Sequence, residues 1–381
     1  MSEQLDTTPT FDAIAFRQQL HRFPELSGDE VNTAQVIATQ LTSFGLKPII
    51  GVGGHGLFCV IDSGKQGQTT LFRADFDALP ITEKATHGHV SQHDGIMHAC
   101  GHDGHTASLL KVAKQLSITP PAHGKVILLF QPAEETGTGA SAMINDPRLT
   151  KLPIDNVFAY HNLPGYQLSQ IIIKDQTFAC ASVGAMVGLK GKTSHAARPE
   201  NGVSPTNAMV DLIGFLQTLP ENYRDAFCLV TIVHASLGEE AFGIAPGEAK
   251  VMATMRSDCN QAFGDMKVKL AGKVEQLALQ HGLEVEITWE EPFNAAVNST
   301  KHVELVKSVA RHTHLDIHEL EEPMRWSEDF AEFLTKWNGA LFCIGSGESH
   351  PELHNPDYDF PDAILDTANS VFLGLVNELH R

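Results

Sequence analysis

The order of strand-like and helix-like segments constrains the fold of this 381-residue chain more than any other feature. In the first half, short apolar runs typical of buried strands alternate with segments of helical periodicity. The predicted strands are Leu57–Ile61, Thr70–Ala74, Lys125–Phe130 and Val157–Tyr160, and the predicted helices are Phe11–His21, Glu30–Phe44 and Thr106–Leu116. This alternation predicts an α/β domain with a mainly parallel sheet, in which functional residues collect at the carboxyl ends of the strands.

A different order of elements begins near Ser182. The predicted elements are a strand at Gly184–Leu189, a helix at about 205–219, strands at Phe227–His234 and Ala249–Arg256, a helix at Gln261–His281 and a strand at Leu283–Trp289. This β-α-β-β-α-β order is typical of a ferredoxin-like α+β sandwich. The first pattern then resumes with a helix at Ser327–Trp337, a strand at Ala340–Ile344 and a helix at Pro361–Leu379. We therefore expect a domain of residues 183–290 inserted into a larger domain formed by residues 1–182 and 291–381.

Composition excludes several classes of partner. The chain has 27 basic and 46 acidic residues, a formal net charge of −19, and a phosphate backbone would repel it, so we expect no nucleic-acid partner. No segment approaches the ~18 uninterrupted apolar residues of a membrane span, and the first residues lack the features of a signal peptide. The six cysteines are scattered, which indicates reduced thiols. We expect a soluble, cytoplasmic protein without a membrane partner.

Histidines are concentrated in one short segment. Six of the 20 histidines lie between His87 and His105, and Cys100 and His102 stand two residues apart within this segment. Thiolate and imidazole are preferred ligands of zinc and similar ions. A helix predicted to begin just afterwards would favour the thiolate form of Cys100. Taken alone, the pair is equally consistent with a polar surface loop that contains a buried cysteine.

Carboxylates and further histidines follow other predicted strands. Adjacent side chains of Glu134 and Glu135 point in different directions, so one can bind a metal ion while the other faces a water molecule. Alone, the pair could also be a solvated first turn of a helix. His161 follows the next strand, and His354 lies near the C-terminus; either could be a purely structural histidine.

Two acidic residues, Asp75 and Asp77, are spaced to share one face at the end of a strand. They could accept a hydrogen bond from the second ring nitrogen of a metal-binding histidine and so orient it, or they could form a turn before Pro80.

Eight segments together carry a family resemblance. They are HRFPELSGDE, RADFDALPITE, MHACGHDGHTASLL, LLFQPAEE, YHNLPG, GKTSHAARPENGVSP, WSEDF and LHNPDYDF. In this order they resemble the metal-dependent amidohydrolases, a family that includes hippurate hydrolases, indoleacetyl-amino-acid hydrolases and N-acetyl-diaminopimelate deacetylases. Aminoacylases and glutamate carboxypeptidases are more distant relatives. The resemblance covers nearly the whole chain and implies a metallopeptidase-like catalytic domain with an inserted lid or dimerisation domain.

The resemblance also implies roles for individual residues. The ligands of two divalent ions, Mn²⁺ or Zn²⁺ with Co²⁺ or Ni²⁺ as alternatives, are expected at Cys100, His102, Glu135, His161 and His354. Cys100 is expected to bridge the ions, with His102 and His161 on one ion and Glu135 and His354 on the other. Glu134 is expected to be the general base.

Two residues of the inserted domain also receive roles from the resemblance. His195 is expected to bind substrate and stabilise the oxyanion from a neighbouring subunit, so we expect a homodimer or larger homo-oligomer. Arg256 is expected to bind the carboxylate of the substrate.

The implied reaction is hydrolysis of the amide bond of an N-acyl amino acid. A dipeptidase or carboxypeptidase with the same di-metal centre is the alternative, and a non-catalytic binding protein is a further one, although such a protein would have no need of Glu134. The chain departs from the family pattern at Gly243, where an asparagine is usual, and at Trp326, where a small residue is usual. Both departures bear on substrate preference, and neither affects a predicted metal ligand.

Overall fold

The computed structural model describes residues 11–381, which form two compact units. The first unit comprises the described residues up to Gln176 together with Asn298–Glu321 and Glu332–Arg381, and the second comprises Thr177–Val297 and Glu322–Ala331. The second unit is therefore larger than the insertion predicted at 183–290. Backbone hydrogen bonds from Met324 to Phe178 and from Cys180 to Met324 bring the segment 322–331 into it.

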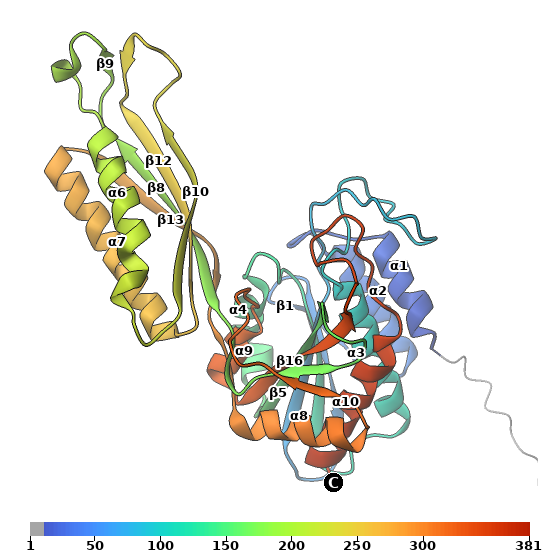
Figure 1. Cartoon of the computed structure of the whole chain (residues 1–381). Coiled ribbons are helices and arrows are strands. Elements are labelled where there is room, and N and C mark those ends of the chain that lie inside the picture. Colours follow the sequence, from blue (N-terminus) through green and yellow to red (C-terminus); the bar gives the residue numbers. More distant parts are fainter. Residues whose placement is uncertain (1–10) are drawn as a thin grey trace, which may run out of the picture. The chain divides into compact units, whose positions relative to one another are not determined.

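The first unit is built on an eight-stranded sheet of order β1-β2-β4-β3-β5-β16-β6-β15 (Figure 1). Its strands are β1 (Ile49–Val52), β2 (Gly56–Asp62), β3 (Thr69–Asp75), β4 (Lys125–Gln131), β5 (Asn156–Pro164), β6 (Ile171–Ile173), β15 (Ile317–Glu319) and β16 (Gly339–Gly347). The central strands β4, β3, β5 and β16 are mutually parallel, while β1, β2 and β6 pair in the antiparallel sense with their neighbours β2, β4 and β16. The parallel strands thus place their carboxyl ends at one end of the sheet.

Five long helices of the first unit share one apolar core with the sheet. The helices of this unit are α1 (Ala13–Arg22), α2 (Val31–Ser43), α3 (His102–Ile118), α4 (Gly139–Ile144), α5 (Pro147–Thr150), α8 (Thr300–His312), α9 (Ala331–Lys336) and α10 (Ile364–Leu379). In the core, the ring of Phe72 on β3 lies 5.8 Å from that of Phe158 on β5 and 4.8 Å from that of Phe372 on α10. Burial of each such ring contributes roughly 1.5–3 kcal/mol. The apolar core that α3 shares with the sheet therefore holds the helix in place beside the ends of the neighbouring strands.

The second unit contains a four-stranded antiparallel sheet of order β10-β12-β8-β13. Its elements are β8 (Ala181–Lys190), β9 (Ser194–His195), α6 (Thr206–Thr218), β10 (Cys228–Leu237), β11 (Ile244–Ala245), β12 (Glu248–Ser257), α7 (Asn260–His281) and β13 (Glu284–Phe293), with short 3-10 turns at Pro199–Asn201 and Leu219–Asn222. The helices α6 and α7 share an apolar core with this sheet. The strand order confirms the ferredoxin-like prediction. The chain also forms two two-stranded pairs, β9 with β11, and β7 (Gln176–Ala179) with β14 (Ala296–Asn298).

Sequence periodicity missed some elements and overextended another. The helix α8 was not predicted, although Val303, Val306 and Val309 lie buried on one of its faces. The helix predicted from Ser327 begins only at Ala331, because the Glu328 carboxylate accepts the backbone N–H of Phe330 and holds the chain in a turn. Among residues 11–381, no helix has both the length and the apolarity that a membrane span requires.

Candidate metal centre

The predicted ligands converge at the carboxyl ends of the parallel strands. His161 lies near the end of β5, Glu135 follows β4, and Cys100 and His102 flank the start of α3. Gly101 between them has φ +89°, and a Cβ atom there would lie 2.5 Å from Oδ1 of Asn162. Only glycine therefore allows the chain to turn into α3 with Cys100 and His102 both at the strand ends.

One group of ligand atoms comprises Cys100 Sγ and the Nε2 atoms of His102 and His161. The sulfur lies 3.4 Å from His161 Nε2. The Nδ1 of His161 donates to the carbonyl of Asn162, which leaves Nε2 to face the sulfur. The Nδ1 of His102 lies 3.0 Å from the carbonyl oxygen and 3.1 Å from Oδ1 of Asp77. Each histidine is thus oriented through one nitrogen and presents the other, as metal-binding histidines do.

A second group combines Cys100 with Glu135 and His354. Nε2 of His354 lies 3.7 Å from Glu135 Oε2, and Nε2 of His102 lies 3.8 Å from Glu135 Oε1. His354 has φ +64°, and its backbone N–H donates to the carbonyl of Ala99, so the loop that carries it is fixed beside Cys100. Cys100 belongs to both groups, as a bridging ligand would.

The electrostatics of the site fit a bound cation. Burial alone would lower the pKa of His102, but Asp75, Asp77 and Glu135 raise it to about 10. Burial raises the pKa of Glu135 to about 7, although nearby His102 lowers it. His102 Nε2 and Glu135 Oε1 are buried and make no hydrogen bond within residues 11–381. A divalent cation would provide both atoms with a partner and neutralise the adjacent carboxylates.

Glu134 lies beside the ligands on a sharply bent segment. It is buried, and one of its oxygens lies with atoms of His102 and Glu135 in a further compact group. Ala133 adopts the left-handed φ of +53°, which costs energy for a residue with a Cβ atom. The buried carboxylate of Glu30 accepts the N–H groups of Ala133 and Gly28 and so holds this bend. The segment HRFPELSGDE, which ends at Glu30, belongs to the family resemblance, but no role was predicted for Glu30 itself.

Asp77 connects the two ligand groups. Its Oδ2 accepts the backbone N–H of Glu135 at 3.0 Å and the hydroxyl of Ser27 at 2.7 Å, while Oδ1 contacts His102. The prediction that Asp77 orients a ligand histidine agrees with these contacts. Asp75 instead binds His105, which was not singled out, and also pairs with Arg73.

The other two predicted site residues lie in the second unit, which carries none of the predicted metal ligands. His195 is exposed on β9, where it pairs with Ile244 of β11, and its Nδ1 accepts the N–H of Ala197. Nη1 of Arg256 donates to the carbonyl of Arg325 and lies 3.3 Å from Oγ of Ser327.

The two residues that depart from the family pattern also lie in the second unit. Gly243 is exposed and accepts the N–H of Ala196, so it adjoins the strand that carries His195. The ring of Trp326 packs edge to face against Phe178, with 6.0 Å between the ring centroids.

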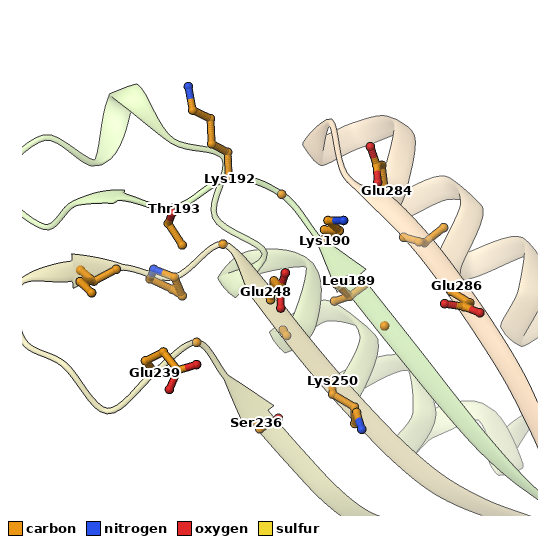
Figure 2. A pocket seen from close by; sticks show the side chains of 18 residues that line it. Leu189, Lys190, Lys192, Thr193, Ser236, Glu239, Glu248, Lys250, Glu284 and Glu286 are labelled. Carbon is orange, nitrogen blue, oxygen red and sulfur yellow. The ribbon is translucent and has the colours of Figure 1, made fainter.

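A hollow of about 930 Å³ at the end of the sheet in the second unit is of a different kind (Figure 2). Its lining includes three lysines (Lys190, Lys192 and Lys250) and four glutamates (Glu239, Glu248, Glu284 and Glu286). The charges nearly balance, and no histidine or cysteine lines it. Nothing in this hollow corresponds to the ligand chemistry of the first unit.

Comparison with known proteins agrees with this geometry. The model of peptidase family M20/M25/M40 matches residues 71–378. Hippurate hydrolase from Campylobacter jejuni is 31% identical over 98% of this chain and 97% of its own length. N-acetyl-L-cysteine deacetylase from Bacillus subtilis is 31% identical over 92% of this chain and 84% of its own length.

A solved structure is similar over the same extent. The YXEP protein of Bacillus subtilis, a dinuclear metal binding peptidase of the M20 family, matches with a TM-score of 0.82 and 26% identity, covering 97% of both chains. The chain therefore belongs to peptidase family M20/M25/M40, and it is an amidohydrolase.

Proposed function

We propose that the protein hydrolyses N-acyl amino acids, with an acetyl or aromatic acyl group, to a carboxylate and a free amino acid. The observation that carries this proposal is the convergence of Cys100, His102, Glu135, His161 and His354 around a buried Glu134. The names of relatives support the substrate class, since hippurate hydrolase and N-acetyl-L-cysteine deacetylase are both named for an N-acyl amino acid.

In this proposal the five ligands hold two divalent cations, Mn²⁺ or Zn²⁺, with Co²⁺ or Ni²⁺ as alternatives. Cys100, His102 and His161 would hold one, and Cys100, Glu135 and His354 the other. Bound there, the cations would polarise the scissile carbonyl and lower the pKa of water. Asp77 would keep His102 in the tautomer that presents Nε2.

Glu134 is proposed as the general base and acid. Its carboxylate would accept a proton from the attacking water and then deliver that proton to the nitrogen of the leaving amine. A carboxylate buried beside the ligand atoms stays within reach of both positions. The water oxygen ends in the new carboxylate, and the amide nitrogen leaves as the free amino group.

His195 and Arg256 are proposed to act on the substrate. His195 would donate a hydrogen bond to the oxyanion of the tetrahedral intermediate. Arg256 would bind the substrate carboxylate through its guanidinium group. We further propose that His195 serves the site of a neighbouring subunit, which makes the active protein a homodimer or a larger homo-oligomer.

Metal depletion and substrate comparison test the proposal. We expect prolonged chelation to abolish hydrolysis and Mn²⁺, Zn²⁺ or Co²⁺ to restore it, because the cations would polarise the scissile carbonyl and lower the pKa of the attacking water. N-acetyl, N-benzoyl and dipeptide substrates are compared with the restored enzyme, and the N-acyl amino acids should have the highest kcat/KM. Full activity in protein shown to be free of metal would exclude the metal centre, and preference for dipeptides would exclude the substrate class.

A further inference from the structure

A second cluster of metal-binding side chains lies in the first unit, outside the proposed catalytic ligands. The ligand atoms of His21, His87 and Asp359 lie within 4.8 Å of one another, and Oε1 of Glu83 lies 3.2 Å from Nε2 of His21 and 3.0 Å from Nε2 of His87. Glu83 and His87 belong to the segment that follows β3, Asp359 to the segment before α10 and His21 to α1, and the ring of His89 stacks on that of His87. The proposed catalytic mechanism uses none of these residues.

Nε2 of His87 lies at metal-binding distances from oxygens of Glu83 and Asp359. His87 Nε2 is 3.0 Å from Glu83 Oε1 and 3.9 Å from Asp359 Oδ2. The edge of a zinc tetrahedron with bonds of about 2.0–2.1 Å measures about 3.3 Å, a length that these two distances bracket. Neither ring nitrogen of His87 makes a hydrogen bond with the described part of the chain, although a carboxylate oxygen lies close by.

The charges of the cluster favour a cation. Four carboxylates, those of Glu83, Asp103, Asp359 and Asp362, are crowded around Arg17 and the three histidines His21, His87 and His89. Both ring nitrogens of His21 contact carboxylates, of Asp103 and Glu83, and these contacts outweigh burial and raise its pKa to about 9.

The two oxygens of Asp359 share a contact with Nε2 of His89 and differ in their other neighbours. Oδ1 accepts from Nη1 of Arg17 at 2.7 Å. Oδ2 faces the stacked rings of His87 and His89, whose centroids are 3.8 Å apart. Nε2 of His89 lies 3.0 Å from Oδ2, so a cation bound at Oδ2 would take the place of this contact. The side chains of His87 and Asp359 are 20% and 29% exposed, so an ion could enter from solvent.

The proposed catalytic centre shows the same combination of features. There, Nε2 of His102 lacks a hydrogen bond within the described residues and lies 3.8 Å from an oxygen of Glu135. In the second cluster, Nε2 of His87 is placed in the same way relative to Glu83. A histidine nitrogen that faces carboxylates without a shared hydrogen bond is the arrangement expected around a cation.

We propose that Glu83, His87 and Asp359 bind a third divalent cation, of the zinc type, which has a structural role. The ion would connect the segment after β3 to the segment before α10. These segments already meet where the N–H of Lys84 donates to the carbonyl of Pro356, two residues beyond the catalytic ligand His354. The ion would therefore stabilise the loop that presents His354.

Metal stoichiometry tests this site without reference to activity. The holoenzyme is equilibrated with buffered free Zn²⁺, passed through a desalting column and analysed for zinc per chain. We expect three ions in the wild-type protein and two in His87→Gln, because an amide is a poor zinc ligand. Added Zn²⁺ should also raise the Tm of wild-type holoenzyme by about 2–4 °C and leave that of His87→Gln unchanged.

Two further variants make the result specific. His93→Gln is the matched control, since His93 lies on the same segment, is exposed, and its Nδ1 contacts the carbonyl of Pro24. This variant should keep three ions. Cys100→Ala should lose catalytic zinc and keep the third ion. This variant therefore distinguishes a failure of the proposed catalytic centre from a failure of the proposed third site. Two ions in the wild-type protein, three in His87→Gln, or a loss shared by His93→Gln would each overturn the proposal.

Discussion

The proposed metal ligands of the first unit and the His195 loop of the second unit differ in how their side chains are held. Cys100, His102 and His161 are buried, and each histidine is oriented through its second nitrogen by a hydrogen bond. His195 is exposed on a strand of two residues, and its side chain accepts a single N–H, that of Ala197.

This difference predicts that metal affinity and kcat depend on different regions of the molecule. A site whose ligands are fixed by burial and hydrogen bonds within one unit can hold cations without help from the other unit. An exposed residue in a short strand pair can contribute only when substrate is present, so its effect should fall on the transition state. Substitutions in the first unit should therefore divide into those that change metal affinity and those that change kcat, whereas substitution of His195 should change kcat alone.

The largest expected effect divides the two adjacent glutamates. Glu134→Gln should retain both cations and lower kcat by ~10²–10⁴-fold, because loss of a general base has this magnitude. Glu135→Gln should weaken metal binding, since Glu135 lies between the imidazoles of His102 and His354. Metal analysis and kcat are measured on the same preparations. If Glu134→Gln empties the site while Glu135→Gln stays loaded, the two roles have been assigned in the wrong order.

An intermediate effect is expected at His195. His195→Ala should leave the metal content unchanged and lower kcat by ~10²–10³-fold, the usual cost of removing one oxyanion donor. KM should change little, since the lost hydrogen bond forms mainly in the transition state. Loss of metal in this variant would contradict the separation of the two regions.

Mixing two impaired variants tests whether His195 acts across subunits. In a heterodimer of His195→Ala with Glu134→Gln, one site would combine an intact Glu134 with an intact His195 of the other chain. With free subunit exchange, about one quarter of wild-type activity should return. If His195 serves its own chain, every site carries one lesion and mixing restores nothing. Exchange of subunits must be shown independently, and a fully active monomer would exclude the hypothesis.

The sequence predicted the parts of the fold that depend on local patterns. The central strands and α3 carry continuous apolar runs or a wide apolar face, and they were predicted within a few residues. The rule that parallel strands share an end brought Glu135 and His161 together, and the family resemblance added Cys100 and His102 as ligands. The family resemblance supplied His354, which lies far from the other ligands in the sequence.

Other features depend on contacts that no local pattern encodes. Glu30 holds the bend at Ala133 across 103 positions of sequence. In the sequence it resembles an ordinary glutamate at the start of a helix, and only the structure shows that it is buried. The edge strand β15 and its neighbour β6 have only three residues each, too few for a periodicity to be recognised. The segment 322–331 joins the second unit through backbone hydrogen bonds. Because backbone groups are the same for nearly every residue type, the sequence does not reveal these bonds.

The smallest expected effect concerns Asp77. Its substitution tests how strongly hydrogen bonds within the first unit orient the metal ligands before a cation binds. In Asp77→Asn, one oxygen is replaced by an NH₂ group that must face either the Nδ1–H of His102 or the backbone N–H of Glu135. Two donors then oppose each other in a buried site, so one ligand is displaced or the His102 tautomer changes. Metal affinity should fall by ~10–100-fold, as is typical when a partner of a ligand histidine is altered.

A competition titration with a chelator measures this affinity, and Asp62→Asn provides the matched control. Asp62 also ends a strand of the first unit, but it is exposed and paired with Lys125 at the surface. Its substitution should leave metal affinity unchanged. Once saturated with metal, Asp77→Asn should recover most of its kcat, because Glu134 and the site of His195 are unaltered. If the metal affinity of Asp77→Asn is unchanged, burial and the ligands themselves hold the cations. The hydrogen bonds from Asp77 to His102 and Glu135 would then contribute little to metal binding.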